Sequence, residues 1–279
     1  MHKIFFLFVF LMAIALFGQE GEDVPSWFLG VGGEVYIPSS LQSDFYAGYP
    51  ENVNNLNYVL SNSYWYAEIK TLFDEHVQRD SFQLVEYPTV RYGVGFAPSF
   101  TVHYRWNDDF YISVHSLVAK LKPQGMATFE VYPPFPGDVH SYVYLPVEGV
   151  ERRSVFSFNF TYFFPSKTSF RWFSELGAML TSVRVLSHML YVFDRPYTLQ
   201  DVYGVPYVPN AGLVAMNIHQ GGTSVGIDAS VGLRWKPSRN YAVDLFYRGM
   251  ISSINLEGYN RVGFHQSAGV KIFASFVVK

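Results

Sequence analysis

Hydrophobic residues alternate with small or polar residues along eight stretches of this 279-residue chain. The clearest stretch is 90–106, where the even positions are Val, Tyr, Phe, Pro or Trp and the odd positions are Arg, Gly, Ala, Ser, Thr or His. A period of two is the signature of a β-strand whose two faces meet different surroundings. The chain is therefore predicted to be all-β, with one apolar and one small or polar face on each strand.

The connections between these stretches alternate in length. The other seven stretches are 27–37, 110–122, 156–164, 170–184, 224–235, 241–248 and 267–278. Three links are short and rich in turn residues, namely 107–109, 165–169 and 236–240, and the remaining links are the longer segments 38–88, 123–152, 185–222 and 252–262. An even number of strands with alternating short turns and long loops is typical of a transmembrane antiparallel up-and-down β-barrel, with the short turns in the periplasm and the long loops outside.

The apolar faces are predicted to point outward into lipid. The opposite faces are rich in Gly, Ser, Ala and Thr, which suits a narrow interior better than a water-exposed surface. Aromatic side chains of the apolar faces also collect near the short turns, as in a membrane-interface girdle. The predicted girdle consists of Trp27, Trp106, Phe110, Phe164, Trp172, Trp235 and Tyr241. A secreted soluble barrel or sandwich, with its apolar faces turned inward, is the alternative.

The N-terminus has the pattern of a secretory signal peptide. His2 and Lys3 precede an unbroken apolar run over 4–17, which is too short for a spanning helix but suits a signal-peptide core. We expect 1–18 to be the signal peptide, 19–26 a short N-terminal periplasmic segment and 27–279 the barrel. No later run is long and apolar enough for a transmembrane helix.

Composition excludes several classes of function. The formal net charge is −3, so a basic surface for nucleic acid is not expected. The chain has no cysteine, which excludes disulfides, thiolate metal sites and a cysteine-linked lipid anchor. The eight histidines show no metal-binding spacing, and no phosphate loop or nucleotide fingerprint is present. We therefore expect no cofactor.

The alternation, the loop asymmetry and the girdle together resemble the small eight-stranded outer-membrane barrels, the class that includes the transmembrane domain of outer membrane protein A. The resemblance implies location in the outer membrane, contact with its lipid and lipopolysaccharide, and insertion by the outer-membrane assembly machinery. These barrels often end on Phe, whereas this chain ends Phe276-Val-Val-Lys. Pro98 lacks an N–H donor, so it marks either a bulge or a turn at 97–99 that would raise the strand count.

Charged residues occur on faces that the barrel would turn inward. Counting from the short turns gives a lower layer and a layer near mid-height. The lower layer contains Arg105, Arg171, Arg234 and Asp244, and the middle layer contains Glu34, Glu175, Asp228, Arg248 and Lys271; Arg91 is also placed inward. Buried charges need partners, so we predict an internal salt-bridge network that fills the barrel. A narrow charged pore is the alternative.

The long segments 38–88, 123–152 and 185–222 are the candidate contacts with an external surface partner. Apolar residues at near-helical spacing within 58–78 predict a short amphipathic helix, and 126–147 reads as a hairpin that extends two strands above the membrane. The segments are rich in aromatic residues, which suit recognition but serve equally well in packing loops together.

One arrangement suggests catalysis. His265 and Ser267 share a face of the last stretch, so a base would lie near a nucleophilic hydroxyl. The lipid A deacylases are similar in using a His-x-Ser pair on an eight-stranded barrel with a downstream Glu, for which Glu257 is the only nearby substitute. The favoured interpretation is a non-enzymatic barrel with a structural or surface-interaction role. The alternatives are this deacylase-like activity and a narrow channel or carrier of small apolar ligands.

Overall fold

The computed structural model describes residues 27–132, 141–200, 220–238, 240–256 and 258–276. The predicted signal peptide, the segment 19–26 and Glu257 lie outside the described residues. The strands are β1 (Trp27–Ile37), β2 (Phe82–Glu86), β3 (Arg91–Tyr92), β4 (Gly95–Arg105), β5 (Phe110–Leu121), β6 (Pro123–Val131), β7 (Ser141–Phe163), β8 (Phe170–Val192), β9 (Arg195–Thr198), β10 (Gly221–Trp235), β11 (Tyr241–Leu256) and β12 (Tyr259–Phe276). The helices are the 3-10 helix η1 (Ser40–Ala47), α2 (Leu56–Leu60) and α3 (Ser63–Val77).

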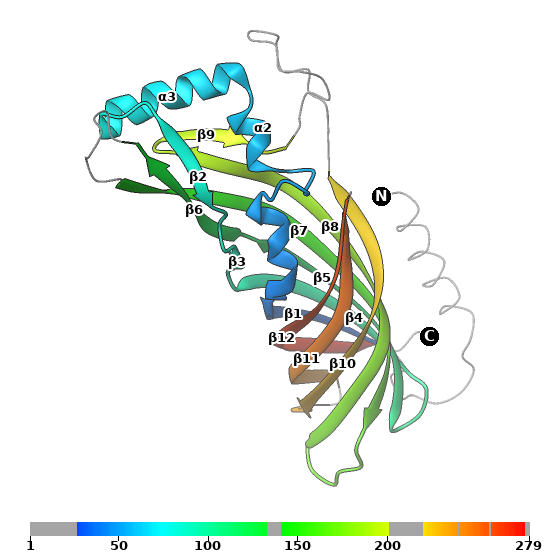
Figure 1. Cartoon of the computed structure of the whole chain (residues 1–279). Coiled ribbons are helices and arrows are strands. Elements are labelled where there is room, and N and C mark those ends of the chain that lie inside the picture. Colours follow the sequence, from blue (N-terminus) through cyan, green and yellow to red (C-terminus); the bar gives the residue numbers. More distant parts are fainter. Residues whose placement is uncertain (1–26, 133–140, 201–219, 239, 257, 277–279) are drawn as a thin grey trace.

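Eight of the strands close into a ring (Figure 1). The order is β1-β4-β5-β7-β8-β10-β11-β12, every neighbouring pair is antiparallel, and β12 returns to β1. Closure leaves this ring without a free edge, which is what a sheet in lipid requires. The predicted eight-stranded antiparallel barrel is confirmed. None of the helices in the described ranges is both long and apolar enough to cross a bilayer.

The strand register fixes the tilt of the barrel. Starting from Phe110 on β5, the pairings lead through β7, β8, β10, β11 and β12 to Val35 on β1, which pairs with Phe96 on β4. Extending the β4–β5 register by three residues brings the circuit back to β5 at Lys120, ten residues from its start. With about 3.3 Å per residue and about 4.8 Å between strands, this stagger corresponds to a tilt of about 40°. Transmembrane barrels have tilts in this range.

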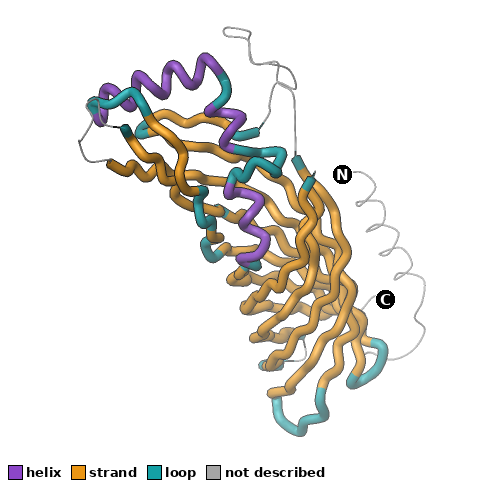
Figure 2. Tube along the Cα trace, viewed as in Figure 1, coloured by secondary structure: helices purple, strands orange, loops and turns teal. Residues whose placement is uncertain are grey.

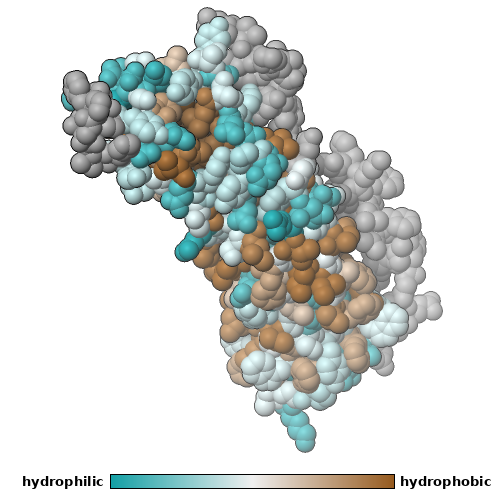
Figure 3. Space-filling view, in the orientation of Figure 1, coloured by the Kyte–Doolittle hydropathy of each residue, from teal (hydrophilic) through white to brown (hydrophobic). Residues whose placement is uncertain are grey.

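Apolar side chains cover the outside of the ring. The outward faces expose residues such as Val31, Phe96 and Val225, whereas Ser, Thr and His side chains of the opposite faces are buried. In Figure 3 hydrophobic residues cover much of the barrel flank that faces the viewer. Near the short turns Trp106 is 69% and Trp172 is 63% exposed. Phe110, Phe164, Trp235 and Tyr241 are also exposed at this end, while Trp27 is partly covered beside Tyr104.

Part of the sheet continues well beyond the ring (Figure 2). β7 and β8 are 23 residues each, and their outer halves pair with β6 and β9, with β2 added beside β6. Large parts of 123–152 and 185–222 are therefore strand rather than loop, because these backbones continue the ladders of the barrel. The predicted hairpin is confirmed as β6–β7, and the predicted helix is confirmed as α2 and α3. We call β2, β6, β9, α3 and the outer halves of β7 and β8 the outer ledge.

The stretch 90–106 does not form one continuous strand. It breaks at 93–94 into β3, which pairs with β6, and β4, which pairs with β1 and β5. The break reverses the facing: Tyr92 turns inward and Arg91 is exposed, so the prediction of an inward Arg91 was wrong. Pro98 lies within β4 opposite Gly33, and the ladder to β5 begins one residue later, at Ser99. No turn forms at 97–99.

Candidate functional site

The periplasmic end of the barrel interior is closed by aromatic rings around one buried ion pair. Arg234 donates two hydrogen bonds to Asp244, of 2.6 and 2.7 Å, and both residues are buried. The guanidinium carbon of Arg234 lies 4.3 Å from the ring centre of Phe163 and 4.7 Å from that of Phe273. The same cluster contains Phe28, Tyr111, Phe173 and Phe246. Sequence reasoning placed the charges but did not predict this cluster of rings, although Phe28, Phe246 and Phe273 occupy inward positions of the alternation.

Two other arginines of the predicted lower layer lie at the rim instead. Arg105 forms an ion pair with Asp108 in the adjoining turn, and Arg171 reaches Asp109 at 2.6 Å. Arg105 and Arg171 belong to the last residues of β4 and the first of β8, where a long side chain extends out of the barrel toward water. The prediction that they join the interior network was wrong.

The middle of the interior holds a network of charges and hydroxyls. Arg248 lies 3.6 Å from Glu175 and 3.5 Å from Asp228. Glu175 also accepts hydrogen bonds from Ser230, at 2.6 Å, and from Thr161, at 3.1 Å. These residues come from β7, β8, β10 and β11, so the network ties four strands together across the interior.

Glu34 and Lys271 complete this middle layer. Glu34 lies 3.0 Å from His115 and accepts a hydrogen bond of 2.8 Å from Ser267. The Lys271 ammonium lies 4.3 Å from the ring centre of Phe246. His115 was not among the predicted partners, although its position on the inward face of β5 was readable from the alternation.

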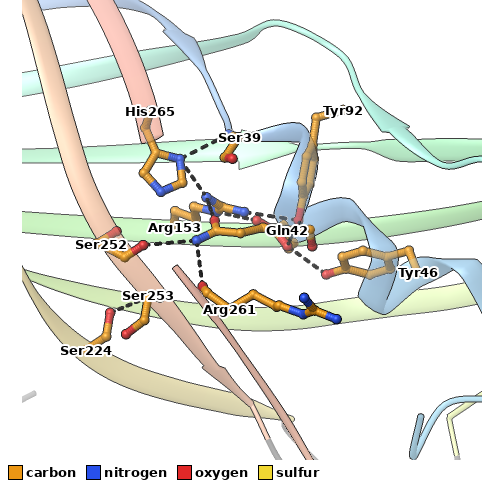
Figure 4. A network of polar contacts seen from close by, with 11 residues as sticks. Ser39, Gln42, Tyr46, Tyr92, Arg153, Ser224, Ser252, Ser253, Arg261 and His265 are labelled. Carbon is orange, nitrogen blue, oxygen red and sulfur yellow. Dashed lines mark hydrogen bonds and ion pairs between the residues drawn. The ribbon is translucent and has the colours of Figure 1, made fainter. Parts of the chain in front are cut away.

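The outer mouth is occupied by the first extracellular segment (Figure 4). η1 enters the ring, and Gln42 is fully buried there. The Gln42 amide donates to the carbonyl oxygens of Ser252 on β11 and Arg261 on β12, both at 3.0 Å, and its oxygen accepts from Arg153 on β7 at 2.9 Å. One side chain thus links three strands of the ring. Tyr46, at the end of η1, adds a hydrogen bond of 2.8 Å to Glu151.

Glu151 and Arg153 are the buried charges around which η1 is held. Their side chains pair at 2.5 Å, and Tyr92 donates to the same carboxylate at 2.9 Å. Burial and the neighbouring carboxylate raise the pKa of Tyr46 well above its ordinary value, so this phenol stays a donor. Glu151 lies in the segment 123–152 that was predicted to be a loop, and Arg153 lies between this segment and the stretch 156–164, so no alternation identified either residue.

Two glycines make room for η1 on opposite walls. A Cβ on Gly149 of β7 would lie 2.3 Å from the Tyr46 ring, and one on Gly263 of β12 would lie 2.6 Å from Ser39 and 2.7 Å from the Gln42 amide nitrogen. Atoms do not approach this closely, so any larger residue at either position would push η1 outward. The mouth is shaped to receive this segment.

His265 and Ser267 each form a hydrogen bond with a different partner. The Nδ1 atom of His265 accepts the backbone N–H of Ser39 at 3.1 Å, and Ser267 donates to Glu34. Both side chains are buried, at 0% and 1% exposure, beneath η1. Each polar group therefore serves a different structural contact, and neither is open to a lipid substrate. Among the described residues no group of three or more His, Asp or Glu is arranged to hold a metal ion.

A closed eight-stranded ring with an apolar outside, aromatic rings near one rim and a polar, charge-paired interior defines an integral β-barrel of the bacterial outer membrane. No protein-family model matches the chain, and no curated protein sequence matches it.

Solved structures with a similar fold include three small barrels. Neisserial surface protein A is 12% identical, with 90% of this chain and 97% of that chain covered and a TM-score of 0.41. OprG from Pseudomonas aeruginosa is 10% identical, with 92% and 98% covered and a TM-score of 0.40. The attachment invasion locus protein Ail of Yersinia pestis, bound to the heparin analogue sucrose octasulfate, is 10% identical, with 91% and 99% covered and a TM-score of 0.37.

Proposed function

We propose that this protein is a non-conducting, non-enzymatic outer-membrane barrel that holds the outer ledge as a rigid surface for an external partner. The observation that carries the proposal is the continuity of β7 and β8 from the membrane into the ledge. About eleven residues of β7 lie beyond Arg152, and at the tilt of the barrel they reach roughly 28 Å further from the membrane.

The outer ledge has its own hydrophobic core. Leu72 and Phe73 of α3 pack on Phe129, Leu145 and Leu190 of the sheet beneath them. Phe73 stacks on Phe82 of β2, with their ring centres 4.3 Å apart. A packed core fixes the shape of a surface before a partner arrives, which lowers the entropy lost on binding.

Exposed tyrosines on the ledge supply contact area for recognition. Tyr142 and Tyr144 lie on the outward face of β7, with 55% and 62% of their surface exposed, and Tyr64 and Tyr66 are exposed on α3. Rigid aromatic side chains of this kind often dominate binding energy at protein interfaces.

Conduction requires an open interior, and catalysis by the inward-facing His265 and Ser267 would require one as well. The aromatic rings around Arg234, the middle charge network and η1 lie one above another along the barrel, and this stacking supports a closed structure. The purified protein in a planar bilayer should give no conductance steps. Regular conductance steps from the full-length protein, with η1 in place, would favour the narrow-channel alternative.

Surface recognition is tested on intact cells that display the full chain. We expect these cells to bind at least one member of a panel of immobilised glycans and proteins, and Tyr142→Ser with Tyr144→Ser to reduce that binding at least about fivefold. The pair Tyr64→Ser with Tyr66→Ser tests the helix side, and Lys167→Ser in a periplasmic turn is the control. Binding to no member, or binding that neither tyrosine pair changes, would overturn the recognition role.

A further inference from the structure

Three cations lie side by side on the outside of the barrel. Lys120 on β5 pairs with Arg152 on β7, and Arg152 pairs with Arg184 on β8. Lys120 and Arg152 are exposed on the outward face, and Arg184 is partly exposed on it. Lys122 follows two residues after Lys120, also exposed. We call Lys120, Lys122, Arg152 and Arg184 the basic row.

The basic row lies at the outer edge of the apolar band. Lys120 is ten residues from Phe110 on β5, and Arg152 is ten residues from Tyr162 on β7. Both spans run along strands that are tilted relative to the barrel axis. At about 3.3 Å per residue and a tilt of about 40°, ten residues rise about 25 Å, which is the height of the apolar band of an outer-membrane barrel. Lys120 and Arg152 are therefore at the level of the headgroups of the outer leaflet, and Arg184, which pairs with Arg152 and is fourteen residues from Phe170 at the start of β8, lies at or above that level.

Like charges directly opposite each other destabilise a sheet. No other described residue forms a hydrogen bond or an ion pair with the side chains of the basic row, and the Arg184 Nε atom is buried without a partner. Glu148 lies four residues from Arg152 on the same face of β7, and its side chain accepts a hydrogen bond from Gln124 instead. Within the described structure, the row repels itself and lacks a counter-charge.

The surface beneath the row has the order of groups found in an anionic lipid. Next on the outward face are Ser154 and Ser182, with Val118 paired to Ser154, and Leu180 follows on β8 toward the membrane centre. A bound lipid would place its phosphate oxygens against the cations and its acyl chains against the apolar residues. The serine hydroxyls between them would form hydrogen bonds with the polar groups of the same lipid. Neighbouring strands are about 4.8 Å apart, so three of them spread the charge over about 10 Å, wide enough for more than one phosphate.

The opposite flank lacks this arrangement. At the matching height, ten residues above the short-turn end, β11 exposes Ile251 and β1 exposes Ile37. An anionic lipid attracted only by the average field of the protein would not distinguish the two flanks. The basic row occupies only the flank formed by β5, β7 and β8, so binding should be confined to that flank.

We propose that the basic row is a binding site for the phosphate groups of lipopolysaccharide in the outer leaflet. The site lies on the membrane flank and uses none of the ledge residues invoked for recognition, so the two proposals fail independently. Because the ligand chemistry is shared with glycerophospholipids and free phosphate, the test has to separate these sources.

The test uses the full chain, folded in detergent, with fluorescently labelled lipopolysaccharide as the probe. Lys120→Gln, Arg152→Gln and Arg184→Gln combined should weaken binding at least ~tenfold, since each cation–phosphate contact is charge-assisted. Arg261→Gln, an exposed cation at the outer end of β12 outside the row, is the matched control and should bind like the parent protein. The shift in gel migration on boiling reports that every variant is folded.

Four competitors identify the ligand. Unlabelled lipopolysaccharide should displace the probe, whereas its dephosphorylated form should do so at least ~tenfold less well, because the phosphates carry the contacts. Equal competition by the dephosphorylated form would overturn the proposal. So would equal competition by phosphatidylglycerol or inorganic phosphate, which would indicate a general anion surface, or full binding by the triple variant.

Discussion

The lower and upper halves of β7 show opposite distributions of polarity on one continuous strand. Within the membrane ring its inward side chains include Asn159 and Thr161, and its outward ones include Phe160. In the outer ledge the inward side chains are Leu145 and Val147, and the outward face carries tyrosines and Glu148.

The difference follows from what surrounds each half. Lipid offers no hydrogen bonds, so the lower half must turn its apolar groups outward and satisfy its polar groups inside. Water reverses the preference above the membrane, where apolar groups are buried under α3. The lower half is therefore stabilised inside by paired charges and the upper half by hydrophobic packing, and four changes test this contrast.

The largest effect should come from breaking the lower ion pair. Arg234→Met leaves the buried Asp244 carboxylate without its partner, which should cost the barrel about 3–5 kcal/mol. The measurement is the denaturant midpoint of the shift in gel migration on boiling. Replacing both residues, with Arg234→Met and Asp244→Leu, should recover most of the loss. A single variant as stable as the parent would contradict the role of the pair.

Phe73→Ala tests the upper half. Removing this buried ring should destabilise the outer ledge by about 3 kcal/mol. We expect faster cleavage of α3 by external protease on intact cells and an unchanged boiling transition of the barrel. The exposed Tyr64→Ala on the same helix is the control. A barrel transition that falls with Phe73→Ala would mean that the two halves unfold together.

Gly149→Ala addresses the junction between the halves. The new methyl group would overlap the Tyr46 ring, so η1 should be displaced at a cost of about 2 kcal/mol. Increased proteolysis within 38–48 reports the displacement. Tyr46→Ala added to Gly149→Ala should remove the steric conflict. If η1 is displaced further in this double variant than in Gly149→Ala alone, the overlap with the Tyr46 ring is not the cause of the displacement.

The smallest expected effect is a pH dependence of η1. Burial lowers the pKa of His188 to about 4, and its Nε2 atom donates to the Tyr46 carbonyl at 3.1 Å. Once η1 leaves, the pKa of His188 returns toward about 6.5. Between about pH 6.5 and pH 4 the undocked state therefore binds a proton that the docked state does not, so docking of η1 weakens as the pH falls. At pH 5.5 the loss should be about 1.4 kcal/mol relative to pH 7.5. Proteolysis of η1 at the two pH values measures it, and His188→Gln should abolish the difference.

Much of the membrane half was predictable because its signals are local. The alternation placed Phe160, Arg234 and Asp244 on the correct faces, and the short turns gave the hairpins of the ring. The rim positions of Arg105 and Arg171 were not predictable from alternation, since that pattern gives the face of a residue and not where its long side chain ends.

The sequence by itself determined that this chain is a barrel with an apolar outside, because lipid imposes a period-two pattern on every strand. Only the tertiary structure decided what closes the mouth, since the bond from Ser39 to His265 joins residues 226 positions apart. It also decided which cations meet: Lys120, Arg152 and Arg184 become neighbours through the register of three strands. Register depends on pairing between distant segments, and no local pattern specifies it.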